Sequence, residues 1–159
     1  MTESIFPRIP RLSPAAAAGA LAERHEIDDR FKWKLEMIFA DWESWEACYA
    51  EVERALPDLA ARQGTLAESG AGLLATIEAI HAQQRQLEKA LVFAGMKSDE
   101  DTRDGDNTAR KGRVSSLAVR FSEAVSWFES ELLEITPAQL QAMVAAEAGL
   151  ARYEHFFHN

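Results

Sequence analysis

The feature that most constrains this chain is a pair of long stretches in which apolar residues recur at alternating spacings of three and four. This spacing places the side chains along one face of an α-helix, as in a coiled-coil seam. We expect one helix from about Ser69 to Lys97 and another from about Asn107 to Glu134. The seam positions are Leu73, Ile77, Ile80, Gln84, Leu87, Leu91 and Ala94 in the first, and Val114, Leu117, Phe121, Val125, Phe128 and Leu132 in the second.

The segment that joins these two helices, residues 98–106, is short and polar. The helices are therefore expected to fold back as an antiparallel hairpin with facing seams. An earlier helix should begin after Asp41 as its N-cap and pack beside the hairpin. Pro57 should kink or end that helix, and Gly64 should stop any continuation. Its apolar face comprises Trp42, Trp45, Tyr49, Val52 and Leu56.

A final helix has a clear start signal, with Thr136 as N-cap, Pro137 at the first helical position and Gln139 three residues after the cap. This pattern is a capping box. The helix should end near Gly149 and be followed by aromatic residues at helical spacing. The sequence thus predicts an all-α fold, a long antiparallel helical hairpin plus flanking helices.

The domain organisation expected for the 159 residues is a mobile or loosely docked N-terminal arm, residues 1–26, followed by one helical domain, residues 27–159. The formal net charge of −9 argues against nucleic acid as a partner. No stretch is apolar enough to suggest a membrane span. Cys48 is the only cysteine and is expected to be a buried thiol, which suits a cytoplasmic protein.

The histidines do not form a recognisable metal site. A zinc peptidase uses two histidines one helical turn apart with a glutamate between them. His25 and Glu26 begin this pattern, but Asp29 stands where the second histidine would be. His155 and His158 have no evident third ligand. We interpret His25, His155 and His158 as surface histidines.

The acidic run at residues 98–106 invites a calcium-loop interpretation. If Gly105 occupied the turn position of such a loop, the closing glutamate position would hold Lys111, a cation. We therefore interpret the run as a solvated loop, with Asp106 or Asn107 capping the helix that follows. The aromatic residues Trp33, Phe39, Trp42 and Trp45 could line a peptide-binding surface, but core packing is the favoured interpretation.

Several segments match, in order, the pattern of a known enzyme family. They are Trp33, Leu35, Ile38 and Phe39, then Trp45, then a long helix ending near residues 99–101, then Phe128-Glu129-Ser130-Glu131-Leu132, and finally Tyr153 with Phe157. In these points the chain resembles the N-terminal region of the oligoendopeptidase F family of zinc metallopeptidases, part of the thimet-oligopeptidase-like clan.

The resemblance implies an N-terminal lobe that packs against a larger helical catalytic lobe, with oligopeptides bound in the channel between them. In that family the His-Glu-x-x-His zinc helix lies in the later lobe. No catalytic, cofactor-binding or metal-ligating residue can therefore be assigned to this chain, which is expected to end before a catalytic domain that carries the zinc. The parent protein would be a zinc metalloendopeptidase, and this chain alone would be inactive. Candidate interlobe packing residues are Trp33, Phe39, Tyr153, Phe156 and Phe157.

A second interpretation belongs to a different class of protein. The chain could be a non-enzymatic helical-hairpin interaction protein that forms a homodimer through its apolar seam.

Overall fold

The computed structural model describes residues 26–157. The chain forms two compact units, with the boundary between Trp33 and Lys34. Before that boundary lies the short 3-10 helix η2 (Asp29–Phe31). The arm expected at residues 1–26 lies outside the described residues apart from Glu26. Its boundary with the helical domain stays a prediction.

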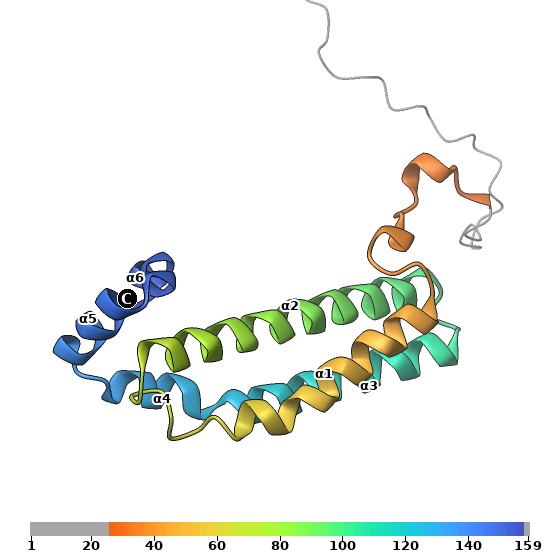
Figure 1. Ribbon diagram of the computed structural model, residues 1–159. Coiled ribbons are helices and arrows are strands. Elements are labelled where there is room, and N and C mark those ends of the chain that lie inside the picture. Colours follow the sequence, from red (N-terminus) through yellow and green to blue (C-terminus); the bar gives the residue numbers. More distant parts are fainter. Residues whose placement is uncertain (1–25, 158–159) are drawn as a thin grey trace, which may run out of the picture. The chain divides into compact units, whose positions relative to one another are not determined.

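The unit that begins at Lys34 is built from helices (Figure 1). No β-strand occurs between residues 26 and 157, so the all-α prediction is confirmed. In chain order the elements are η3 (Leu35–Met37), α1 (Trp42–Ala60), α2 (Gly70–Glu100), α3 (Gly105–Val125), α4 (Trp127–Glu134), α5 (Pro137–Ala146), η4 (Ala148–Tyr153) and α6 (Glu154–Phe157).

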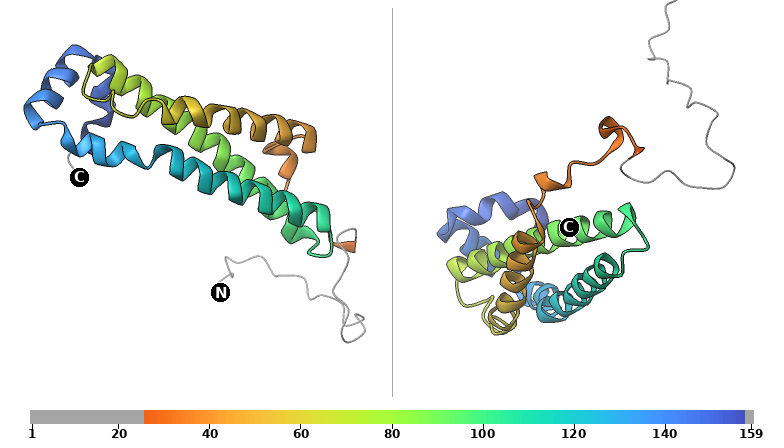
Figure 2. Two further views of the ribbon diagram at one scale, coloured as in Figure 1. Left: turned by 90° about the horizontal axis from the view of Figure 1, so that it is seen from below. Right: turned by 90° about the vertical axis from the view of Figure 1, so that its right-hand side faces the viewer.

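Helices α1, α2 and α3 lie side by side in both views of Figure 2. The hairpin of α2 and α3 and the packing of α1 beside it are as predicted. Two ion pairs set the register of α1 against α3: Arg113 binds Glu46, and Arg120 binds Glu53. Each pair spans the same sequence separation of 67 residues. The two pairs lie one heptad apart on both helices, so α1 and α3 run parallel.

The predicted seam of α2 is wrong at Gln84, which is exposed and donates a hydrogen bond to Glu88. Its neighbour Gln83 is half-buried instead, and its Oε1 is enclosed without a hydrogen-bond partner among the described residues. Helix α2 packs against both α1 and α3, which widens its buried face beyond a single seam. Ala90 and Phe93 are buried for the same reason.

The single helix predicted for residues 107–134 is in fact two, α3 and α4, separated at Ser126. Ser126 Oγ donates to the carbonyl of Glu123 at 2.9 Å, and Trp127 Nε1 donates to that of Ala124 at 2.8 Å. These side chains use carbonyls that an uninterrupted helix would bond through its backbone, and such competition breaks or bends helices.

The N-cap of α3 is Asp104, two residues before Asp106 and three before Asn107, the two predicted positions. Its carboxylate accepts hydrogen bonds from the backbone N–H groups of Asp106 at 2.9 Å and Asn107 at 3.0 Å. Any acidic residue in this run can cap a helix, so the sequence did not distinguish Asp104 from Asp106.

Helix α1 begins as predicted, with a capping box between Asp41 and Ser44. Pro57 does not end the helix, which continues to Ala60. Pro57 lies in the last turn, where its missing N–H removes one hydrogen bond, while buried Leu56 and Leu59 on either side hold the turn against the core. Gly64 follows in the left-handed region at a φ of 85°, as expected for a residue that stops a helix.

Helix α5 has the predicted capping box. Thr136 Oγ1 accepts from the Gln139 backbone N–H, and Gln139 Oε1 accepts from the Thr136 backbone N–H. Helix α5 and η4 pack on the first half of α2 and form a second core. At Gly70, helices α2 and α5 are so close that a Cβ at this position would lie 2.7 Å from the Met143 carbonyl oxygen. The buried residues of this core are Leu66, Leu73, Ile77, Ile135, Met143 and Leu150.

We predict that Gln83→Leu stabilises the protein by about 1 kcal/mol, because it removes a buried amide oxygen that lacks a hydrogen bond. The midpoint of thermal unfolding should rise by roughly 2–4 °C. Gln84→Leu, on the exposed neighbour, is the matched control and should leave the midpoint nearly unchanged. Equal effects of the two substitutions would contradict the assignment of Gln83 to the core.

We predict that Gly70→Ala destabilises the protein by about 1–3 kcal/mol, because the added methyl group would collide with the Met143 carbonyl. Gly95→Ala, in the same helix, has open space at its Cβ and should stabilise the protein by up to about 1 kcal/mol. Urea unfolding of the two variants should give shifts of opposite sign, and shifts of the same sign would contradict the close approach.

Candidate functional site

The segment from Trp33 to Phe39 combines one exposed and one packed aromatic residue. Trp33 belongs to the part that ends at the division of the chain and is 57% exposed. Leu35 is buried, and the ring of Phe39 meets that of Phe93 edge to face at 5.4 Å. Of the two packing residues predicted in this segment, Phe39 is therefore engaged in the core and Trp33 is open to solvent.

The other predicted aromatic residues form a cluster in the core. Trp42 contacts Trp45 at 5.3 Å and Phe93 at 5.0 Å between ring centroids. Trp45 is fully buried, and its Nε1 donates a hydrogen bond to the Ala90 carbonyl at 2.9 Å. Core packing, the favoured interpretation, is thus what the structure shows for Phe39, Trp42 and Trp45.

Arginine side chains of α3 cover the outer side of this cluster. The Arg110 guanidinium lies 4.4 Å from the ring of Trp42, and that of Arg113 lies 4.6 Å from the ring of Tyr49. Arg113 also binds both carboxylate oxygens of Glu46, at 2.6 and 2.8 Å. These hydrogen bonds hold the pKa of Glu46 below its usual value. The arrangement ties α1 to α3.

The C-terminal aromatic residues pack on the second core to different degrees. Tyr153 is half-buried, with its ring 5.8 Å from that of His81, and Phe157 packs against the same core. Phe156 is 47% exposed. The neighbouring Arg152 forms an ion pair with Glu78 of α2, which fastens η4 to that helix.

Of the histidines singled out in the sequence, His25 and His158 lie outside the described residues. Among residues 26–157, no three His, Cys, Asp or Glu side chains are grouped so that they could hold a metal ion. Cys48 is buried as predicted, with its Sγ 3.6 Å from the Gln86 carbonyl, and burial raises the pKa of its thiol.

The acidic residues of the hairpin loop have local partners. Asp101 binds Arg103 through both carboxylate oxygens, which lowers the pKa of Asp101 to about 2. Asp99, in the last turn of α2, pairs with Lys111 at 3.1 Å. Together with the capping role of Asp104, these contacts agree with a solvated helix-to-helix loop, but the loop is shorter than the predicted residues 98–106, because α2 continues to Glu100 and α3 begins at Gly105.

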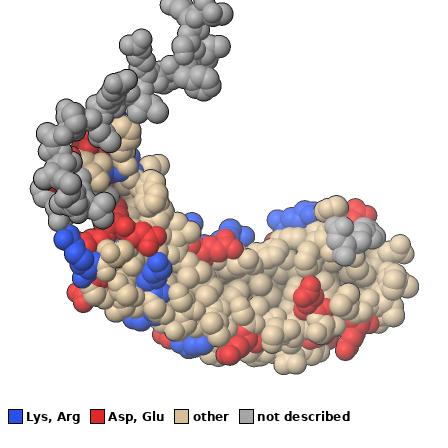
Figure 3. Space-filling model, turned by 180° about the vertical axis from the view of Figure 1, so that it is seen from behind, with Lys and Arg blue, Asp and Glu red and all other residues tan. Residues whose placement is uncertain are grey.

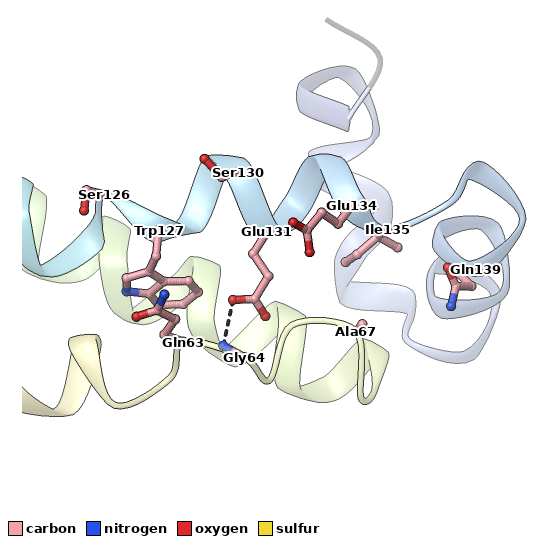
Figure 4. A pocket seen from close by; sticks show the side chains of 10 residues that line it. All are labelled: Gln63, Gly64, Ala67, Ser126, Trp127, Ser130, Glu131, Glu134, Ile135 and Gln139. Atoms are coloured by element: carbon pink, nitrogen blue, oxygen red, sulfur yellow. Dashed lines mark hydrogen bonds between the residues drawn. The ribbon is translucent and has the colours of Figure 1, made fainter.

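A groove of about 690 Å³ lies between α4 and the loop that joins α1 to α2 (Figure 4). It is an open surface site rather than an enclosed cavity. The residues that line it are Gln63, Gly64, Ala67, Ser126, Trp127, Ser130, Glu131, Glu134, Ile135 and Gln139.

Glu131 holds the loop side of this groove to α4. Its two carboxylate oxygens accept hydrogen bonds from the backbone N–H groups of Gly64 at 2.7 Å and Leu66 at 2.8 Å. Sequence reasoning identified Glu131 only within the segment 128–132 and missed this role. The partners lie 67 and 65 residues away, so no local pattern could have identified them.

The surface offers little further indication of a site. On the face shown in Figure 3, the described acidic and basic side chains are interspersed over uncharged surface. No helix between residues 26 and 157 is both long enough and apolar enough to cross a membrane.

No family model matches the chain, but comparison with known proteins finds several peptidases of similar sequence. Group B oligopeptidase PepB of Streptococcus agalactiae serotype III (strain NEM316) is 32% identical over 134 residues, which is 84% of this chain and 22% of that protein. The plasmid oligoendopeptidase F of Lactococcus lactis subsp. cremoris is 29% identical over 135 residues, again 84% of this chain and 22% of the relative. The chain thus spans about a fifth of the length of these relatives.

Two solved structures share the fold. Oligoendopeptidase-F from Enterococcus faecium superposes with a TM-score of 0.68 at 33% identity, covering 74% of this chain and 23% of that one. A putative peptidase from Chlamydophila abortus gives a TM-score of 0.74 at 20% identity, covering 87% of this chain and 24% of that one. The second likeness concerns the fold alone.

We predict that Phe39→Ala and Trp33→Ala differ in their effect on stability. Loss of the half-buried Phe39 ring should lower the free energy of unfolding by about 2–3 kcal/mol, because its contact with Phe93 is lost. Loss of the exposed Trp33 side chain should change it by no more than about 0.5 kcal/mol. Thermal unfolding followed by circular dichroism distinguishes the two, and equal losses would show that Trp33 is also packed.

Proposed function

Because this chain is a homologue of the oligoendopeptidase F peptidases over a stretch that fits their N-terminal region, we propose that it is the N-terminal lobe of a zinc-dependent oligoendopeptidase. In this proposal the lobe forms one wall of a channel in which short peptides are bound and hydrolysed. The observation that carries the proposal is the match itself. It extends over most of this chain but over only 22–23% of the relatives' length.

The partner of the lobe in this proposal is the catalytic lobe of the same protein. The family pattern places the His-Glu-x-x-His zinc helix there, and this chain has no such sequence. Its own contribution would be to bind and orient the peptide rather than to activate water or hold zinc. The free, buried thiol of Cys48 supports a cytoplasmic setting for the parent protein.

The five residues predicted to pack between the lobes differ in exposure, and in this proposal they have two roles. They are Trp33, Phe39, Tyr153, Phe156 and Phe157. Trp33 and Phe156 are the most open of the five, so they are the ones available for direct contact with the catalytic lobe. Phe39, Tyr153 and Phe157 pack partly on this chain's own cores and would act by holding the surface in place.

The alternative of a dimer formed through the helical seam finds no support. Its central residues, such as Ile80, Leu87 and Leu117, are buried within a single chain. Since α1, α2 and α3 already cover one another, a second copy would need a different surface.

We predict that a chimera of Streptococcus agalactiae PepB, with this chain in place of the matched stretch, hydrolyses a quenched fluorescent peptide. Chelation of zinc should abolish that hydrolysis. The isolated chain should show neither stoichiometric zinc by elemental analysis nor hydrolysis of the same peptide. PepB with the stretch deleted is the control and should be inactive.

Two results would count against the proposed function. One is a folded, zinc-loaded chimera that is no more active than the deletion control. The other is chelator-sensitive hydrolysis by the isolated chain, which would place the active site in this chain.

A further inference from the structure

The groove between α4 and the α1–α2 loop is acidic. Of the ten described residues that line it, none is Lys, Arg or His, whereas Glu131 and Glu134 are both carboxylates. A concave surface lined by charges of one sign concentrates the opposite charge and repels its own. The groove therefore favours a cation and disfavours phosphate or a carboxylate ligand.

The two carboxylates differ in how they are held. Glu131 is fixed by the N–H groups of Gly64 and Leu66, so it cannot rotate away from the groove. Glu134 is exposed and forms no hydrogen bond or ion pair with any described residue. Figure 4 shows both carboxylates on the side of α4 that faces the loop. Glu134 thus has its full hydrogen-bonding capacity available beside a second, immobile negative charge.

Trp127 adds a flat apolar surface to the same groove. Its ring is half-buried, and the hydrogen bond from Nε1 to the Ala124 carbonyl fixes its orientation. In Figure 4 the indole projects from the same side of α4 as Glu131, toward the α1–α2 loop. A fixed indole face next to carboxylates suits a cation that carries an apolar or planar group.

These features select among cations. A divalent metal ion requires several oxygen ligands, but here one of the two carboxylates already accepts two backbone hydrogen bonds. A lysine ammonium is a compact, strongly hydrated charge, whereas a guanidinium is planar, stacks on aromatic rings and binds carboxylates through paired hydrogen bonds. The volume of about 690 Å³ accommodates such a side chain together with adjoining backbone.

We propose that this groove binds an arginine side chain presented by an extended polypeptide segment. The guanidinium pairs with Glu134 within the field of Glu131, and its methylene stem lies along Trp127. The site is separate from the peptidase chemistry proposed above, and its test does not depend on that chemistry.

The test uses the 159-residue chain and the probe acetyl-Gly-Arg-Gly-amide, followed by ¹H–¹⁵N correlation spectra. The indole N–H of Trp127 and the backbone N–H of Gly64 should shift saturably with a dissociation constant of roughly 1 mM, as expected for a single anchored side chain. The same peptide with citrulline in place of arginine has nearly the same shape but no charge. It should bind at least about tenfold more weakly, since the ion pair is lost.

The variant Glu134→Gln should weaken binding of the arginine peptide about tenfold, while Glu129→Gln should not change it. Glu129 is an exposed carboxylate on the same helix that does not line the groove. Equal binding of the citrulline peptide, unchanged binding by Glu134→Gln, or shifts confined to other residues would each overturn the proposal. Thermal unfolding should be the same for both variants, because neither side chain is buried.

Discussion

The packing of α1 against the α2–α3 hairpin around Trp45 is the constraint on which the rest of the structure depends. Trp45 is fully buried, and its single polar atom is satisfied by the Ala90 carbonyl of α2. The indole therefore fixes both the depth and the register of α1. The pairs of Arg113 with Glu46 and Arg120 with Glu53 extend the same register along the surface of α1 and α3. They are exposed and add little stability by themselves, but they fit only one alignment of the two helices.

The second core also depends on this packing, because α2, which α1 and α3 hold in place, forms one side of it. Helix α5 and η4 dock where Gly70 and Gly149 have no side chain, so backbone and side chains approach closely. The Glu131 carboxylate joins α4 to the α1–α2 loop and so links the part of the chain after Ser126 to the part before α2. The acidic groove arises from this link, because the same carboxylate that closes the loop forms one of its walls.

In the function proposed above, this chain would bind and orient the peptide rather than activate water. Its relatives are several times longer, and the stretch they share with this chain is a helical scaffold whose aromatic residues lie mainly in the core. Trp33 and Phe156 are among the exposed large apolar side chains of the described residues, as are Phe31, Met37, Val119 and Leu133. Neither Trp33 nor Phe156 belongs to the two hydrophobic cores, so both cores are packed without them.

The sequence by itself determined the helical class, the hairpin and the starts of α1, α2 and α5, because periodicity and capping are local properties read over a few residues. Only the tertiary structure decided which side of α2 is buried at Gln83 and Gln84, since two neighbouring helices cover that face. At Ser126 the helix breaks because the side chains of Ser126 and Trp127 compete with backbone N–H groups for carbonyl oxygens. The spacing of apolar residues does not predict which group wins.

The candidate site was the least predictable part. Glu131 appeared in the sequence as one acidic residue among several on a helix, and its function in the fold depends on two N–H groups more than 60 residues away. Trp33 and Phe39 look alike in sequence, yet one is exposed and the other packs on Phe93. Local sequence determines which elements form, whereas long-range packing determines which of their side chains remain available to a partner.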